Sequence, residues 1–324
     1  MARPLIPSGL PTFPRTAMHA SDLPQPPPGM MTLRVGCMLS YIVHGNVPLL
    51  LLVRPRLEAQ QILLQEVSTT SPAQPFEQFV DSHGNTLVRI MLAPGENMIR
   101  NDMLLLVPNR EENLNLPVHL VPPSVLPPDV LRYTFASRYC ESDRLVQFAQ
   151  ERFDHVRGDP ARLIEAICSW THANIEYRYG TGSSLLSACD ILARGYGVCR
   201  DYAHVMVALC RAMDIPARYA AGYLPYLDKS TAEGDMGVDF HAYCEVYLGG
   251  HWHIYDPRYN RTHKGRIKIA HGMDAVDCAF ATFYGEATLN GFQVWAYDTG
   301  GRDEHAGGPV AMVRGEDGSA VLVT

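Results

Sequence analysis

The sequence predicts an α+β fold, in which a small antiparallel β-domain precedes a core that combines helices with strands. Short strand-like runs separated by turn residues fill residues 31–122, and no helical periodicity interrupts them. Beyond two proline pairs, at 122–123 and 127–128, apolar residues recur at helical spacing. Strand-like runs then return between residues 217 and 297. The length of 324 residues fits two domains.

The β-domain is expected over residues 31–125. Its four clearest strand-like runs are Thr32–Leu39, Pro48–Val53, Gln61–Val67 and Thr86–Leu92. The tetrapeptide Ser82–Asn85 predicts a hairpin turn between Phe79 and Leu87. Residues 1–30 carry eight prolines and no apolar run, so we expect a disordered tail there.

The core is expected over residues 126–298, and a loose, Gly-rich and acidic tail over 299–324. Ser142, Asp159 with Pro160, and Ser187 are the residue types that begin helices. A longer helix is expected from Cys199 to about Met213, with apolar residues on several faces, so it is predicted to be buried. Strands are expected at 217–223, 242–248, 251–255 and 293–297.

Composition and charge exclude several classes of partner. The formal net charge of −7 provides no general attraction for nucleic acid, so no nucleic-acid partner is expected. Wholly apolar stretches such as Leu49–Val53 are too short to cross a bilayer, so no membrane association is expected. Residues 1–30 do not resemble an export signal, which predicts a cytoplasmic protein with eight reduced cysteines.

Cys199 differs from the other seven cysteines in its position, because it follows Gly197-Val198 and begins the predicted helix. A thiolate at such a position faces free backbone N–H groups and the positive end of the helix dipole, both of which stabilise it. A thiolate attacks carbonyl carbons far better than a thiol does, so the position suits a nucleophile. The alternative is an inert buried cysteine, which is the commoner role of free cysteines.

The segment from Phe240 to Pro257 contains a second candidate group. Gly249-Gly250 is a two-residue hairpin turn by composition, which pairs residue 248 with 251 and places Tyr243 opposite Asp256. Strand alternation then puts His241 on the same face as Asp256, as its diagonal neighbour. An imidazole beside an orienting carboxylate is the partner that a thiol nucleophile needs. The alternative is a strand histidine beside an Asp-Pro turn without a catalytic role.

Other chemical features carry weaker signals. His251 and His253 share a strand face, but a zinc site needs three or four ligands, so no metal is expected. His204 is expected to make a structural hydrogen bond, and Asp201 to complement the helix dipole. A basic run just after Asp256 is expected to be a solvated loop and edge strand, with a rim for an anionic substrate or for nucleic acid as the alternative. Its members are Arg258, Arg261, Lys264, Arg266 and Lys268.

These segments, in this order, resemble one known family. Gly195–His204, Ile215–Leu224, Asp239–Tyr243 and Tyr255–Pro257 look like the motifs of microbial transglutaminase-like proteins, whose papain-like core carries a Cys-His-Asp triad. The β-rich part also resembles the transglutaminase-associated β-domain that often precedes this core. Tyr139–Asp143 is similar to the segment that usually opens the core. The resemblance covers about residues 31–298.

The resemblance implies that Cys199 is the nucleophile, His241 the base and Asp256 the orienting carboxylate. It implies cysteine-dependent chemistry on a peptide, isopeptide or side-chain amide through a thioester, and it does not choose between hydrolysis and transfer to an amine. No cofactor is expected. Hydrolysis is slightly favoured, because the sequence identifies no pocket that would hold an amine. Arg258 departs from the family, which commonly has threonine after Asp-Pro. A catalytically silent binding or scaffold module of the same fold is the alternative.

Overall fold

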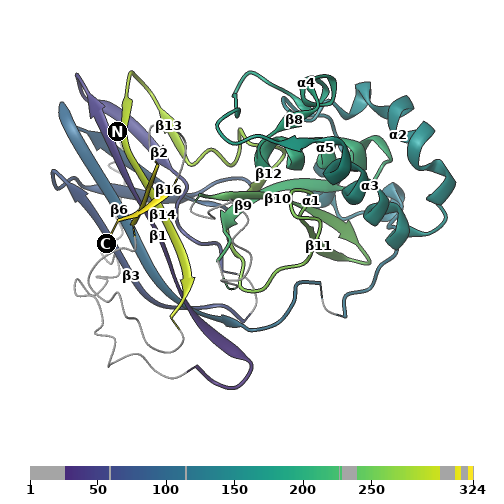
Figure 1. The fold of residues 1–324 in the computed structure, drawn as a ribbon, viewed down its shortest axis with the longest axis horizontal. Coiled ribbons are helices and arrows are strands. Elements are labelled where there is room, and N and C mark those ends of the chain that lie inside the picture. The colour runs from purple at the N-terminus through teal and green to yellow at the C-terminus, as the bar shows by residue number, and fades with distance from the viewer. Residues whose placement is uncertain are drawn as a thin grey trace, which may run out of the picture.

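The computed structural model describes residues 26–57, 60–113, 115–225, 227, 239–299, 311–314 and 320–323. Figure 1 shows two parts side by side, with long strands in one and all the labelled helices in the other. The α+β prediction is confirmed, because strands alone form one part and helices pack on an antiparallel sheet in the other. The predicted N-terminal tail lies outside the described residues up to residue 25.

The N-terminal part contains two antiparallel four-stranded sheets. In one of these strands, β5 (Thr86–Leu92), buried and exposed side chains alternate, as expected for a strand with one face toward a core. The predicted turn at Ser82–Asn85 is confirmed, because Val80 pairs with Thr86 across it. One sheet has the order β14 (Thr288–Asp298), β1 (Met30–Val43), β6 (Gly95–Pro108), β3 (Ile62–Ser71), and the other has β13 (Ala281–Phe283), β2 (Val47–Leu51), β5 (Thr86–Leu92), β4 (Phe76–Val80).

Two strands from the C-terminal third of the chain complete this part. The N-terminal sheets therefore include residues that were expected to belong to the core at 126–298. β14 pairs along β1 from Leu33↔Asp298 onward, and β13 pairs with β2. Gly36 permits this pairing, because a Cβ there would lie 2.4 Å from the Trp295 ring. The strand pattern of β14 was visible in the sequence, but its partner strand pairs with it across at least 246 positions. Within the expected loose tail, β15 (Ala311–Arg314) and β16 (Ala320–Val323) pair with each other; 300–310, 315–319 and 324 lie outside the described residues.

The second part contains the helices and a sheet of order β11-β10-β9-β12. The expected strands are confirmed, and β12 joins them as an edge strand from the stretch that was expected to be a solvated loop and edge strand. Its strands are β9 (Ala217–Tyr223), β10 (His241–Leu248), β11 (His251–Tyr255) and β12 (Ile267–Gly272), with β7 (Glu176–Tyr177) and β8 (Tyr196–Gly197) forming a short parallel pair. Its helices are α1 (Pro128–Leu131), α2 (Val146–Phe153), α3 (Pro160–Asn174), α4 (Ala188–Arg194) and α5 (Cys199–Ala212).

The helix starts follow the sequence signals with one exception. The Asp159 carboxylate accepts a hydrogen bond from the Arg162 N–H at 3.2 Å, with Pro160 as the first helical residue of α3. Ser187 likewise begins α4. Ser142 does not begin α2 as expected. It opens a 3₁₀ turn over Ser142–Arg144 instead, and α2 begins at Val146.

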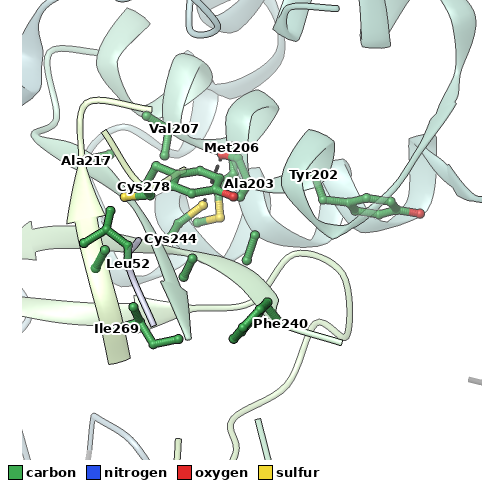
Figure 2. Close-up of a cluster of buried hydrophobic side chains, with 14 of the residues drawn as sticks. Leu52, Tyr202, Ala203, Met206, Val207, Ala217, Phe240, Cys244, Ile269 and Cys278 are labelled. Atoms are coloured by element: carbon green, nitrogen blue, oxygen red, sulfur yellow. Dashed lines mark hydrogen bonds between the residues drawn. The ribbon is translucent and has the colours of Figure 1, made fainter. Parts of the chain in front are cut away.

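Helix α5 lies on the sheet and is buried from Asp201 to Ala212. Figure 2 shows its residues Ala203, Met206 and Val207 facing Cys244 of β10, whose thiol donates to the Ala203 carbonyl at 3.3 Å. This packing holds the first turn of α5 beside the first residues of β10. Among the described residues, no helix has the length and apolarity needed to cross a membrane.

Candidate active site

The hairpin of β10 and β11 brings His241 and Asp256 together. The predicted register is confirmed, with Leu248 paired to His251, and both turn glycines have positive φ, 57° and 86°. His241 begins β10 and Asp256 follows β11, and His241 Nε2 lies 2.7 Å from Asp256 Oδ2. Both side chains are buried, with 8% and 2% of the residue exposed. The hairpin therefore presents a histidine with a fixed carboxylate partner.

Cys199 adds a thiol to this pair. It is the first residue of α5, is only half-buried, and its side chain interacts with the His241 ring closely enough to help raise the pKa of that imidazole. Because Nε2 of His241 is directed at Asp256, Nδ1 is the ring nitrogen that remains available to the thiol. The structure thus brings together the three residues singled out in the sequence, although they come from a helix and two strand ends. Thiol, imidazole and carboxylate are linked in series.

The electrostatics of the pair favour a charged imidazole. Burial disfavours the imidazolium, but Asp256 and Cys199 outweigh it and raise the pKa of His241 to about 9. Burial also disfavours ionised Asp256, yet the His241 ring and Arg266 hold the pKa of this carboxyl well below its usual range. An ionised carboxylate only accepts hydrogen bonds, so Nε2 of His241 carries the proton. An imidazolium at neutral pH stabilises a neighbouring thiolate.

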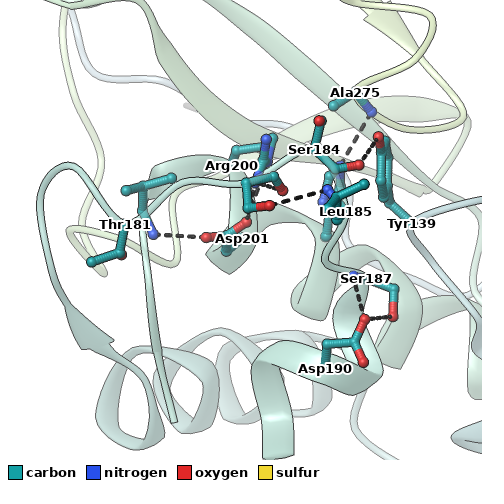
Figure 3. A network of polar contacts seen from close by, with 12 residues as sticks. Tyr139, Thr181, Ser184, Leu185, Ser187, Asp190, Arg200, Asp201 and Ala275 are labelled. Carbon is teal, nitrogen blue, oxygen red and sulfur yellow. Dashed lines mark hydrogen bonds and ion pairs between the residues drawn. The ribbon is translucent and has the colours of Figure 1, made fainter. Parts of the chain in front are cut away.

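The backbone around Cys199 is fixed by Asp201. The Asp201 carboxylate accepts a hydrogen bond from the Val198 N–H at 3.0 Å and pairs with Arg200 at 2.9 Å, in addition to its expected position near the helix dipole. A Cβ on Gly197 would lie 2.6 Å from this carboxylate, so only glycine fits there. Arg200 also donates to the Ser183 carbonyl at 2.6 Å, which ties the loop before α4 to the start of α5. Figure 3 shows Arg200 and Asp201 near Ser184 and Leu185 of this loop.

The other sequence candidates have structural partners. His253 Nε2 lies 3.1 Å from the Pro117 carbonyl, and the described residues contain no group of three or more His, Cys, Asp and Glu side chains placed for a metal. His204 accepts a hydrogen bond from the Ala275 N–H at 3.2 Å, as expected of a structural histidine.

The expectation that the whole basic run is solvated is wrong for two of its members. Arg266 pairs with Glu112 and Asp256, and Lys268 pairs with Glu245 at 2.8 Å, and both cations are buried. The positive charge available to attract an anionic substrate or repel an amine is therefore smaller than the sequence indicates. Arg258 lies with its guanidinium 3.7 Å from the centre of the Tyr177 ring.

Sequence reasoning missed the side chains that hold Asp256. Arg266 Nη2 donates to Asp256 Oδ2 at 3.0 Å, and the Tyr259 N–H donates to Oδ1 at 3.3 Å. His263 Nε2 lies 3.5 Å from Oδ2. Arg266 immediately precedes β12 and Lys268 lies within it, so their spacing of two residues places them on one face. This pattern does not identify Glu112 or Glu245 as their partners.

Comparison with known proteins places the chain in a family. Residues 148–257 match the model of the transglutaminase-like superfamily. The structure is similar to the crystal structure of a proposed cysteine protease from Cytophaga hutchinsonii, with 30% identity, a TM-score of 0.73, and coverage of 83% of this chain and 91% of that chain. An uncharacterized protein of Mycobacterium leprae (strain TN) is 33% identical over 123 residues, which is 37% of this chain and only 43% of the relative. The chain belongs to the transglutaminase-like superfamily.

Proposed function

We propose that the protein is a cysteine-dependent enzyme that cleaves peptide, isopeptide or side-chain amide bonds through a thioester at Cys199. One observation carries the proposal. A partly accessible thiol, Cys199, interacts with a histidine whose Nε2 lies 2.7 Å from a buried carboxylate. A half-buried thiol with a base and an orienting carboxylate is the arrangement that nucleophilic catalysis requires.

The proposed reaction begins with transfer of the Cys199 proton to Nδ1 of His241. Sγ then attacks the amide carbon, and the C–N bond breaks as the imidazolium delivers its proton to the leaving amine. Asp256 keeps the ring oriented and stabilises its positive charge without taking the proton. The backbone N–H of Cys199 is a natural donor to the developing oxyanion, because N–H groups in the first helical turn have no acceptor within the helix.

We propose water as the acyl acceptor. Water needs only a path to the thioester, whereas an amine must be held beside it while water is excluded. Attack by water on the thioester carbon, assisted by His241, releases the carboxylic acid and restores the thiol. This step completes a hydrolytic cycle without any cofactor.

A direct test supplies a labelled primary amine in excess together with a panel of peptide and glutamine-containing amide donors. Free acid is expected to exceed the amine adduct, and both products should disappear in Cys199→Ala. Quantitative mass spectrometry of both products measures the partition. Cys189→Ala is the matched control, because Cys189 is also partly exposed and should be dispensable.

Two results would contradict parts of this proposal. Dominant amine incorporation that depends on Cys199 would make the protein a transferase and leave the nucleophile in place. Absence of both products across the panel would support a binding or scaffold module that retains the fold without turnover.

A further inference from the structure

Two stretches that follow the N-terminal sheets, residues 110–113 and 115–119, are bound to the edge of the catalytic hairpin. We call these residues the linker. The Asn113 side chain accepts a hydrogen bond from the Ile254 N–H at 2.7 Å and donates to the Ile254 carbonyl at 2.6 Å. The Gly249 N–H donates to the His119 carbonyl at 2.9 Å. The linker is therefore a fixed part of the core, and its side chains have defined positions there.

Glu112 of the linker is connected to Asp256 of the triad through Arg266. Its Oε1 accepts a hydrogen bond from Arg266 Nε at 2.6 Å, and Arg266 Nη2 donates to Asp256 Oδ2 at 3.0 Å. The side chains of Arg266 and Glu112 are only 3% and 8% exposed. The Glu112 backbone and side chain also bond the backbone of His263, each at 3.2 Å. One guanidinium thus bridges a linker carboxylate and the triad carboxylate.

We propose that Glu112 and Arg266 are positioning residues of this site, with Arg266 holding Asp256 toward His241 and Glu112 holding and neutralising Arg266. The inference rests on the proposed function of the triad. It extends the site from three residues to five and makes the linker part of it. Charges alternate in sign along the series Glu112, Arg266, Asp256, His241 and Cys199 when the thiol is ionised.

This alternation determines what each substitution does. Glu112→Gln removes a negative charge and leaves the buried Arg266 cation uncompensated, so His241 should bind its proton less tightly. Arg266→Met removes the competing cation, so the opposite shift is expected. The double variant Glu112→Gln/Arg266→Met keeps the summed charge and should return His241 close to its original behaviour. Loss of packing alone would not produce shifts of opposite sign.

Other titratable groups face the same pair and must be separated from this effect. His263 is close to Asp256, but burial and Arg266 lower its pKa to about 3, so it is neutral near neutral pH. Asp239 interacts with His241, and burial raises its pKa to about 6. The Tyr259 ring lies 5.3 Å from the His241 ring. A titration from neutral to alkaline pH avoids both His263 and Asp239.

The test is a histidine ring NMR titration of the full chain over that pH range, with the His241 signal assigned by its loss in His241→Asn. Glu112→Gln should move the His241 midpoint down by about one pH unit, Arg266→Met should move it up, and the double variant should lie between them. Glu111→Gln is the matched control, because it removes the same charge from an exposed neighbour and should leave the midpoint unchanged.

The inference is overturned if Glu112→Gln folds and leaves the midpoint unchanged, or if both single variants move it in the same direction. Thermal melting checks folding. If Glu112→Gln does not fold, Arg266→Met alone decides, with an upward shift supporting the inference and any other result overturning it. Failure of the proposed function would give a different result from failure of this inference, because Cys199 would then be unreactive in the unsubstituted protein.

Discussion

Iodoacetamide at near-neutral pH should alkylate Cys199 before any other cysteine, and His241→Ala should slow this reaction by about 10- to 30-fold. The reaction rate follows the thiolate fraction, and an ordinary thiol is only a few per cent ionised at neutral pH. Burial lowers the pKa of His241, but its interactions with Asp256 and Cys199 outweigh burial and raise the pKa to about 9. At near-neutral pH the ring is therefore an imidazolium, which stabilises a neighbouring thiolate. Removing the ring removes that stabilisation. Intact-protein and peptide mass spectrometry measures the rate at each cysteine.

The chain contains its own controls for this experiment. Cys189 is also partly exposed, but burial and Glu141 raise its pKa to about 11. Burial raises the pKa of Cys37, Cys140 and Cys168 to about 12. His251→Ala removes an exposed histidine from the same hairpin and should leave the alkylation rate unchanged. Faster labelling of Cys189 than of Cys199 would contradict the assignment of the nucleophile.

Glu245→Ala should destabilise the protein by about 3–5 kcal/mol, because it leaves two buried cations without their counter-ion. Glu245 is 3% exposed and lies 2.6 Å from Arg218 Nε and 2.8 Å from Lys268 Nζ. Burial disfavours its charge, but these two cations hold the pKa of the carboxyl well below its usual range. Urea denaturation measures the loss.

The pH dependence of this loss has a defined sign. A carboxyl whose folded pKa is depressed contributes its full stability above its unfolded pKa, about 4.3, and loses it as the pH falls toward the folded value. The difference between wild type and Glu245→Ala should therefore narrow in acid. Glu77→Ala is the control, since Glu77 forms an exposed pair with Arg89, and such pairs contribute at most about 1 kcal/mol. Equal losses in both variants would contradict the account.

The local geometry of the site was predictable because it depends on short-range rules. Gly249-Gly250 determines the hairpin register, and the register places His241 beside Asp256. The start of α5 at Cys199 follows from the helical spacing after Gly197. Each of these inferences uses residues that are close in sequence, where turn type and periodicity limit the alternatives.

The remaining features depend on contacts between distant segments, which a single sequence does not encode in any local pattern. Glu112 meets Arg266 across 154 positions, so no local pattern in the sequence identified Glu112 as a residue that supports the triad. β14 has the alternation of a strand, yet its partner is β1 of the N-terminal sheet. Lys268 was interpreted as a surface charge because its partner Glu245 lies on a different strand.

The most direct test of the central claim is to trap the acyl-enzyme. The protein is mixed rapidly with an activated ester of a peptide donor, quenched in acid during turnover, digested and mapped by mass spectrometry. We expect one acyl group on the peptide that contains Cys199, removable by hydroxylamine and absent from Cys199→Ala. An acyl group on any other residue, or undiminished ester turnover in Cys199→Ala, would contradict the claim.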